Sequence, residues 1–392
     1  MVPEGRDGLS ETLRILFVTD LYEPFIGGLS THQRHLAREL VKRGHTVRVI
    51  TSRLSGTKPQ EVIDGVEIQR LRLHGRSHRF SFGITSTPSV AKTLRVFDLA
   101  QGPTFVAALP LGLATELSGK PSILTVLEVF GEAWKEFYPR KPVTSLAYRE
   151  AERVLLRLNF TRYVAISEHT RKALLSFDIE SRRCDKIYPG IDYGFWTSGY
   201  ANPELFRAGN RIGNRFLYMS YGRAGVSKGI EYLLDAALLV AKRMPDSRFL
   251  LVLNEGETYN LLEKRITESR LLRGHVMLRS RLAGTELRDA VAAANCVVVP
   301  SLSEGFGYTV AEACAIGTPV IASNTASIPE VISGRHLLVS PRNPQAIADA
   351  ILRGRDGDWM VAPPKRFTWN DAATAYEGCF RKALAESRWR LN

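Results

Sequence analysis

The stretch Glu304-Gly305-Phe306-Gly307-Tyr308-Thr309-Val310-Ala311-Glu312 decides how the rest of this 392-residue chain is interpreted. An apolar run at 296–301 precedes it, an Ala-rich segment follows as far as Gly317, and a second apolar run comes at 320–322. This order predicts a strand, a glycine-containing loop, a helix and another strand. Such a loop directs free backbone N–H groups and the positive end of a helix dipole at its occupant. An anion, most commonly phosphate, suits that position.

The two glutamates of this stretch, Glu304 and Glu312, add a second chemical requirement. Carboxylates do not bind phosphate, but they accept hydrogen bonds from hydroxyl groups. A ligand with both phosphate and hydroxyls, such as a nucleotide sugar, would satisfy both halves. A helix-capping acid beside a solvated glutamate is the alternative interpretation of the same spacing.

Two other loops carry residues suited to phosphate. The segment Gly222-Arg223-Ala224-Gly225-Val226-Ser227-Lys228-Gly229 follows one predicted strand and precedes a predicted helix. Its arginine offers a planar fork to phosphate oxygens and its lysine a mobile point charge. Gly27 and Gly28 follow the first predicted strand and allow a ligand close to the backbone. The alternatives are a solvated Arg–Lys pair and a flexible turn, and the G-x-G-x-x-G dinucleotide spacing is absent.

Strands and helices alternate along the chain in two successive arrays. The first array has predicted strands at 13–19, 46–51, 66–71, 122–127 and 163–167, with a helix at 31–43. The second has strands at 216–221, 248–253 and 296–301, with helices at 229–243 and 285–294. Alternation of this kind predicts parallel sheets covered on both faces. We therefore expect an α/β protein with two doubly wound domains, residues 1–192 and 193–368, followed by an amphipathic helix from residue 369.

The composition limits the class of protein. The length allows about two domains, and an apolar fraction of 44% is ordinary for a globular chain. No signal peptide is visible in the polar start, and the longest apolar stretch, 105–114, is too short to span a bilayer. The spacing of the cysteines predicts neither a metal site nor a disulfide framework, so a reducing cytoplasm is expected. These cysteines are Cys184, Cys296, Cys314 and Cys379.

A basic segment at 69–97 stands out in a chain of net charge +13. It contains six cations, no acid and interleaved histidine and phenylalanine residues, and its cations are Arg70, Arg72, Arg76, Arg79, Lys92 and Arg95. Such a segment could contact an anionic acceptor or an anionic membrane surface. A solvated basic loop is the alternative. Nucleic acid is not expected as a partner, because no recognised nucleic-acid module is present.

Taken together, these motifs closely resemble the retaining glycosyltransferases of family 4. The resemblance rests on Glu304-Gly-Phe-Gly with Glu312, on the Gly-Arg…Lys-Gly segment and on the glycine pair of the first loop. It implies the GT-B fold, with two Rossmann-like domains whose parallel sheets face a central cleft. It also implies that the tail, 369–392, crosses back to the first domain. Glycogen synthases and phosphatidylinositol mannosyltransferases belong to the same group.

The resemblance also implies a role for each motif. Glu304 would contact the donor sugar, Glu312 the ribose hydroxyls, and Arg223 with Lys228 the pyrophosphate, so that Arg223, Lys228 and Glu304 form the catalytic set. The loop around Arg281 and Leu282 would hold the base. The full donor-binding set is Gly27, Gly28, Arg223, Lys228, Arg281, Leu282, Glu304, Gly305, Phe306, Gly307, Tyr308, Thr309 and Glu312.

One residue departs from the pattern of the family. Leu127 stands where many relatives have a histidine that contacts the donor sugar, and leucine has no hydrogen-bonding group. Either Glu128 or Glu132 holds the sugar or acceptor instead, or activity is reduced.

The sequence thus predicts a cytoplasmic, metal-independent, retaining glycosyltransferase that needs no cofactor. Its donor would be a nucleoside-diphosphate sugar, and its acceptor a glycan, a lipid-linked molecule or a small molecule. Peripheral contact with the inner face of a membrane is possible on the same grounds. The alternatives are a weakened nucleotide-sugar-binding or regulatory subunit, and a phosphorylase or epimerase on the same fold. The sugar, base, linkage and oligomeric state stay open.

Overall fold

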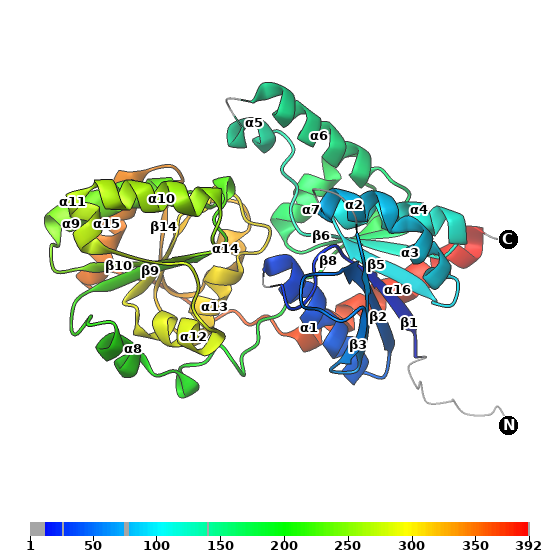
Figure 1. Cartoon of the computed structure of the whole chain (residues 1–392), viewed down its shortest axis with the longest axis horizontal. Coiled ribbons are helices and arrows are strands. Elements are labelled where there is room, and N and C mark those ends of the chain that lie inside the picture. The colour runs from blue at the N-terminus through cyan, green and yellow to red at the C-terminus, as the bar shows by residue number, and fades with distance from the viewer. Residues whose placement is uncertain (1–11, 26, 74–77, 139–140, 391–392) are drawn as a thin grey trace.

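The computed structural model describes residues 12–25, 27–73, 78–138 and 141–390. Two sheets lie side by side, each covered by helices on both faces (Figure 1). In the described residues, the first sheet has the strand order β3-β4-β2-β1-β5-β6-β7-β8 and the second has the order β11-β10-β9-β12-β13-β14-β15. The pairs β3–β4 and β14–β15 are antiparallel, and the other pairs are parallel. This arrangement confirms the predicted α/β class with two doubly wound sheets.

The first sheet is built from short, buried strands linked mostly by helices. Its strands are β1 (Arg14–Val18), β2 (Thr46–Ser52), β3 (Gln60–Ile63), β4 (Val66–Leu71), β5 (Leu99–Pro103), β6 (Ser122–Val126), β7 (Arg162–Ala165) and β8 (Cys184–Lys186). Its helices are α1 (Gly28–Lys42), α2 (His78–Thr85), α3 (Thr87–Leu94), α4 (Ala108–Ser118), α5 (Ala133–Phe137), α6 (Pro142–Leu156) and α7 (Glu168–Leu175).

The second sheet repeats the plan. Its strands are β9 (Leu217–Gly222), β10 (Arg248–Leu253), β11 (Val276–Arg279), β12 (Cys296–Val299), β13 (Val320–Ser323), β14 (Gly334–Val339) and β15 (Met360–Ala362). Its helices are α8 (Pro203–Gly209), α9 (Ile230–Arg243), α10 (Glu257–Glu268), α11 (Arg270–His275), α12 (Gly284–Ala293), α13 (Tyr308–Ile316), α14 (Ile328–Val331) and α15 (Pro344–Arg355).

Burial on both faces explains why central strands such as β1 and β12 are continuous apolar runs. In β1, Ile15 and Phe17 pack on the cluster under α1, while Leu16 and Val18 pack on the opposite face under α2, α3 and α4. The second sheet has one face under α8, α12, α13 and α14 and the other under α9, α10, α11 and α15. A strand covered on both sides needs apolar residues at every position, which is the pattern of parallel sheets.

The last helix, α16 (Trp369–Arg390), packs on the first sheet rather than the second. Its Trp369, Tyr376 and Phe380 share a cluster with residues of β1 and α1. The chain therefore crosses between the sheets twice, and the crossing segments are hydrogen-bonded from Ile191 N to Phe367 O over 2.9 Å. Gly190 permits this crossing, because a Cβ there would lie 2.3 Å from the backbone nitrogen of Trp369.

The strand order places the candidate site. In the first sheet β1 lies between β2 and β5, and in the second β9 lies between β10 and β12, so the order reverses at both points. Ligands of open α/β sheets bind beyond the carboxyl ends of strands at such reversals. The loops after β1, β9 and β12 are the ones that carry the predicted motifs.

Two features of the fold bear on the predictions made above. Helix α1 begins at Gly28, three residues before the predicted start, because Thr31 N already donates to Gly27 O over 2.8 Å. The predicted domain boundary after residue 192 stays a prediction. In the part of the chain that the structure describes, no helix combines the length and apolar character needed to cross a bilayer.

Candidate functional site

Three loops that are far apart in the sequence meet at one place. The loops after β9 and β12 are joined by a hydrogen bond of 2.7 Å from Leu302 N to Ser227 O. The start of α1 joins them, since the ring of Tyr308 lies 3.5 Å from where a Cβ on Gly28 would stand. The site is therefore built by both sheets.

Lys228 and Glu304 form the centre of this site. The Nζ of Lys228 lies 2.7 Å from Oε1 of Glu304, and Ser301 Oγ donates to the same oxygen over 2.8 Å. Both side chains are mostly shielded, with exposed fractions of 24% and 12%. The residue predicted to bind phosphate and the residue predicted to bind the sugar are thus in direct contact. Their separation in the sequence does not show this contact.

Gly229 lets the loops approach so closely, and Gly307 forms the turn into α13. Gly229 has φ 60°, and a Cβ there would lie 2.3 Å from Pro300 O, so the backbone of the β12 loop leaves no room for a side chain. Gly307, with φ 92°, precedes the first residue of α13. Only glycine adopts such conformations readily. Helices α9 and α13 therefore both begin at the joined loops, with free N–H groups at their first turns.

Arg223 is the exposed cation of the site. Within the described residues its guanidinium has no hydrogen bond or ion pair, but its charge acts on Glu128. Arg281 and Leu282 follow β11, the outermost strand of the second sheet. Leu282 packs on the core cluster of this sheet and Arg281 is exposed. Their predicted role toward a base stays a prediction.

Glu312 is held by a tyrosine of β9. Tyr221 OH donates to Glu312 Oε2 over 3.0 Å, and the ring of Tyr221 stacks on Trp196 with centroids 6.4 Å apart. Burial raises the pKa of Glu312 to about 8, and the hydrogen bond from Tyr221 opposes this in part. The backbone of Thr309 lies at the same place, 3.3 Å from the Tyr221 hydroxyl.

Glu128 enters the site from the first sheet. Ser303 Oγ donates to Glu128 Oε1 over 2.5 Å, across the interface between the two sheets. Burial raises the pKa of Glu128 to about 7. The charges of Lys228 and Arg223 lower this pKa, while the charge of Glu304 raises it. One carboxyl of the first domain therefore lies in the field of the predicted catalytic set.

Leu127, the residue before Glu128, contributes to packing between the two sheets. Its side chain packs on the core of the second sheet, and its carbonyl oxygen lies 1.7 Å from where a Cβ on Gly305 would stand. Gly305 is thus required for contact between the two main chains. Glu132, the other proposed substitute for the missing histidine, points elsewhere, since it is 69% exposed and pairs with Lys135 and Arg149.

Phe306 belongs to the packing between the domains. Its ring is buried and meets Tyr188, Tyr308 and Phe367 at centroid distances of 6.3, 5.3 and 5.2 Å. Its side chain is therefore used in aromatic packing. The prediction for Phe306, Gly307 and Tyr308 concerned their backbone and stays a prediction.

The basic segment at 69–97 does not form one exposed patch. Arg70 is buried, pairs with Glu61 and donates to Glu23 O over 2.8 Å, while Phe82 lies in the core. Residues 74–77 lie outside the described residues, as do the side chains of 78–80. The remaining described cations are exposed, namely Arg72, Lys92 and Arg95.

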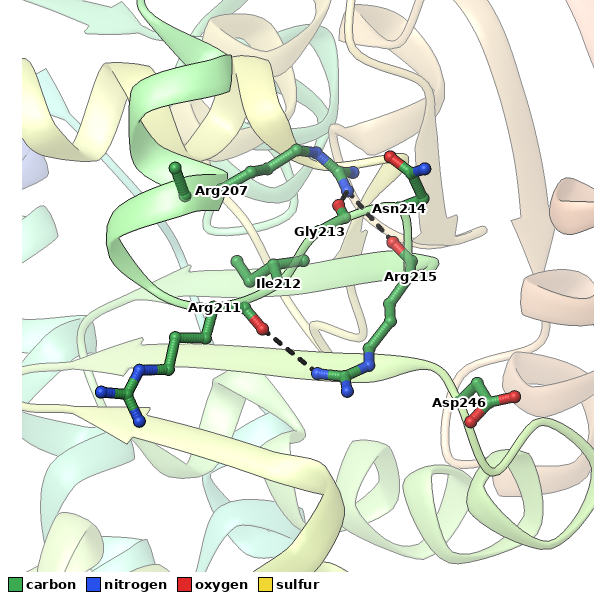
Figure 2. Close-up of a pocket in the computed structure, with 8 residues that line it drawn as sticks. Arg207, Arg211, Ile212, Gly213, Asn214, Arg215 and Asp246 are labelled. Carbon is green, nitrogen blue, oxygen red and sulfur yellow. Dashed lines mark hydrogen bonds between the residues drawn. The ribbon is translucent and has the colours of Figure 1, made fainter.

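A hollow of about 630 Å³ lies at the opposite end of β9 (Figure 2). Arg207, at its edge, donates to the carbonyls of Gly213 and Arg215 over 2.8 and 3.1 Å. It also donates to Ala293 O and to Asn295 Oδ1. This arginine fixes the loop before β9, and the hollow is separate from the site formed by the three loops.

Three residues that hold the charged groups in place were not predicted from the sequence: Tyr221, Ser301 and Ser303. Each adjoins a predicted motif, since Tyr221 precedes Gly222 and both serines lie within three residues before Glu304. Their position beside the motifs was the available signal. Which groups these side chains contact depends on the fold.

Comparison with known proteins agrees with this geometry. The model for "Glycosyltransferase Family 4" matches residues 26–195, and that for "Glycosyl transferases group 1" matches residues 202–356. Glycogen synthase of Mycobacterium tuberculosis is 27% identical over 405 aligned positions, covering 93% of each chain.

Solved structures show the same fold. Sucrose-phosphate synthase from Thermosynechococcus elongatus superposes with a TM-score of 0.77 at 20% identity, covering 95% of this chain and all of the other. The HepE protein of Anabaena, crystallised with UDP-glucose, gives a TM-score of 0.69 at 18% identity, covering 97% and 99%. The chain is a glycosyltransferase of the family-4 type with the GT-B fold.

Proposed function

We propose that this glycosyltransferase transfers a sugar from a nucleoside-diphosphate sugar to a glycan, lipid-linked or small-molecule acceptor, with retention and without a metal. The observation that carries the proposal is the Lys228–Glu304 pair at 2.7 Å, where the loops of β9 and β12 meet. It combines a cation for phosphate with a carboxylate for hydroxyls at the reversal of strand order.

The pair also suggests how the donor is taken up. A pyrophosphate competes with Glu304 for the ammonium group of Lys228 and recruits Arg223, which is exposed and has no partner within the described residues. Glu304 is then released to accept hydrogen bonds from the sugar. Glu312, which is hydrogen-bonded to Tyr221, accepts hydrogen bonds from the ribose hydroxyls.

Catalysis then depends on charge stabilisation and orientation. Arg223, Lys228 and the first turns of α9 and α13 offset the charge that develops on the departing nucleoside diphosphate. Attack from the same face, with the leaving phosphate taking the acceptor's proton, retains the anomeric configuration without a protein nucleophile. Glu128 approaches from the first domain, where we place the acceptor. The protein is cytoplasmic in this proposal, with peripheral membrane contact if the acceptor is lipid-linked.

Removing either cation tests the proposal. Arg223→Ala and Lys228→Ala should each weaken nucleotide binding by about 1.5–3 kcal/mol, the range of hydrogen bonds to charged groups. Lys242→Ala, an exposed lysine on α9, is the matched control and should bind as the wild type does. UDP, ADP and GDP would be screened by thermal shift, and binding of the best probe measured by calorimetry. Normal affinity in both site variants would overturn the pyrophosphate assignment.

The runner-up is a nucleotide-sugar-binding subunit with weakened catalysis. Leu127 favours it, because its side chain is part of an apolar core and has no polar contact to offer a sugar. Release of nucleotide from a nucleotide sugar, with or without acceptor, separates the two functions. Binding without any turnover would support the subunit.

A further inference from the structure

Glu330, on the short helix α14, binds the first turn of a helix from the other domain. Its Oε2 accepts from Glu168 N over 2.8 Å and its Oε1 accepts from His169 N over 2.7 Å. Tyr188 OH, in the segment that connects the domains, donates to Oε2 over 2.8 Å. Both carboxylate oxygens are therefore used, by groups outside the second sheet.

The contact completes the capping of α7. Ser167, its N-cap residue, accepts Thr170 N on its side chain over 3.0 Å and Arg171 N on its carbonyl over 2.9 Å. The N–H groups of Glu168 and His169 are the ones that this cap leaves open, and Glu330 accepts both. A carboxylate at a helix N-terminus also gains from the helix dipole. The first turn of α7 is thus fully satisfied only when the two domains are together.

This contact lies directly behind the loop that carries Glu304. Ser327, the residue before α14, donates its hydroxyl to Glu304 O over 2.9 Å. From the other side, Thr170 Oγ1 lies 3.4 Å from Gly305 O. Movement of α7 relative to α14 therefore has to disturb the backbone of residues 304 and 305.

We propose that Glu330 is a positioning residue for sugar transfer, which clamps the first domain onto the donor loop through the N-terminus of α7. Closed in this way, the domains keep Glu128 beside Ser303 and in the field of Lys228. The clamp itself needs no ligand; only its effect on turnover rests on the proposed function.

A second carboxylate between the domains offers a matched comparison. Glu136 of α5 pairs with Arg342, which follows β14, over 2.5 Å. Both side chains are largely exposed, at 57% and 43%. Exposed pairs of this kind contribute little to stability. Glu330 differs because it accepts two partly buried backbone N–H groups, at 2.8 and 2.7 Å.

Glu330→Gln is the principal variant. Its amide group has to direct an NH₂ at one of the donors, so one hydrogen bond is lost without a change in size. We expect a larger radius of gyration in small-angle scattering. Hydrogen exchange in a peptide from the first turn of α7 should become about tenfold faster, as expected when a charge-assisted bond is lost. Tyr188→Phe removes only the hydroxyl donor from the segment that connects the domains, and it should have a smaller effect of the same kind. Glu136→Gln should leave both measurements at wild-type values.

Ligand measurements separate positioning from general damage. The best binder among UDP, ADP and GDP should bind Glu330→Gln within about twofold of the wild type, because the cations of the second domain are intact. Turnover of the matching nucleotide sugar should fall about tenfold at unchanged KM. Wild-type scattering, exchange and turnover in Glu330→Gln would overturn the proposal, as would equal effects of Glu136→Gln. If no nucleotide binds the wild type, the proposed function fails, while scattering and exchange still decide the clamp. If Glu330→Gln does not fold, exchange in Tyr188→Phe decides it.

Discussion

At the scale of single residues, we expect the buried carboxyl of Glu128 to make the proposed donor binding depend on pH. Its pKa of about 7 lies above the ordinary value of 4.5, mainly because of burial. The folded protein therefore favours the neutral carboxyl. The stabilisation of the fold that results is complete below about pH 4.5 and is lost as the pH rises through about 7. Above about pH 7, Glu128 carries a negative charge near Lys228, Arg223 and Glu304, where the pyrophosphate is proposed to bind.

We expect nucleotide-sugar affinity to fall about five- to tenfold between about pH 6 and pH 8, as one nearby charge at an intermediate dielectric predicts. Glu128→Gln should remove the step centred near pH 7, while Glu132→Gln, on an exposed side chain, should keep it. A step nearer pH 8 belongs to Glu312, whose pKa burial raises to about 8, and should persist in both variants. Calorimetry at several pH values measures the effect. A nucleotide sugar is the right probe, because its pyrophosphate has no second ionisation in this range. Identical pH profiles for wild type and Glu128→Gln would contradict the prediction.

The sequence predicts the charged residues of the site better than their partners. Lys228, Glu304 and Glu312 each lie in a local strand–loop–helix pattern, which locates the first two in the loops after β9 and β12 and the third in helix α13. The contact between Ser303 and Glu128 joins residues 175 positions apart and depends on how the two domains meet. No local pattern specifies that placement. The direct pairing of Lys228 with Glu304 depends instead on β9 and β12 being neighbours in the second sheet, which no local pattern specifies either.

At the scale of elements, helix α6 fixes the loop that presents Glu128. Glu152 of α6 accepts hydrogen bonds from Phe130 N over 3.0 Å, Gly131 N over 2.8 Å and Trp134 Nε1 over 3.1 Å. Burial raises the pKa of Glu152, and these three donors oppose that shift. The loop from β6 to α5 is thus tied to α6 by one carboxylate.

Glu152→Gln should loosen this loop without altering the second domain. Its amide turns an NH₂ toward a backbone donor, at a cost of about 1–3 kcal/mol. We expect faster hydrogen exchange in peptides spanning 128–138 and lower turnover, with nucleotide affinity unchanged within about twofold. Glu150→Gln, on the same helix at a side chain that is 44% exposed, is the control. Unchanged exchange in Glu152→Gln would show that the loop holds its shape without α6.

The elements that the sequence reveals are those buried on both faces. Strands such as β1 and β10 carry continuous apolar runs, and β2 is largely buried; the predicted positions of all three agree with the structure to within a residue or so. The edge strand β15 gave no such signal, because Met360 and Val361 are exposed at 59% and 76% and pair only with β14. In α6, apolar side chains such as Val143 face solvent, so its pattern does not point to a core.

At the scale of the whole molecule, α16 makes the end of the chain part of the first domain. Tyr376 is fully buried, and its hydroxyl lies 3.0 Å from Thr125 Oγ1 of β6 and 3.4 Å from His32 Nε2 of α1. Burial lowers the pKa of His32 to about 3, so the imidazole is neutral and the hydroxyl meets no buried charge. Gln101 of β5 extends the network by accepting from Thr125 over 3.2 Å.

Tyr376→Phe tests whether this network stabilises the crossing of the chain. Removal of the hydroxyl leaves Thr125 and His32 without a common partner in a buried place, which costs about 1–3 kcal/mol. We expect calorimetry to show a lower unfolding temperature for the first domain. Tyr200→Phe, whose ring is largely exposed, should unfold as the wild type does. The chain reaches α16 by crossing from the second domain, so loss of its anchor should also reduce the cooperativity of unfolding between the domains. Equal unfolding of the two variants would mean that the apolar contacts of Trp369 and Phe380 hold α16 on their own.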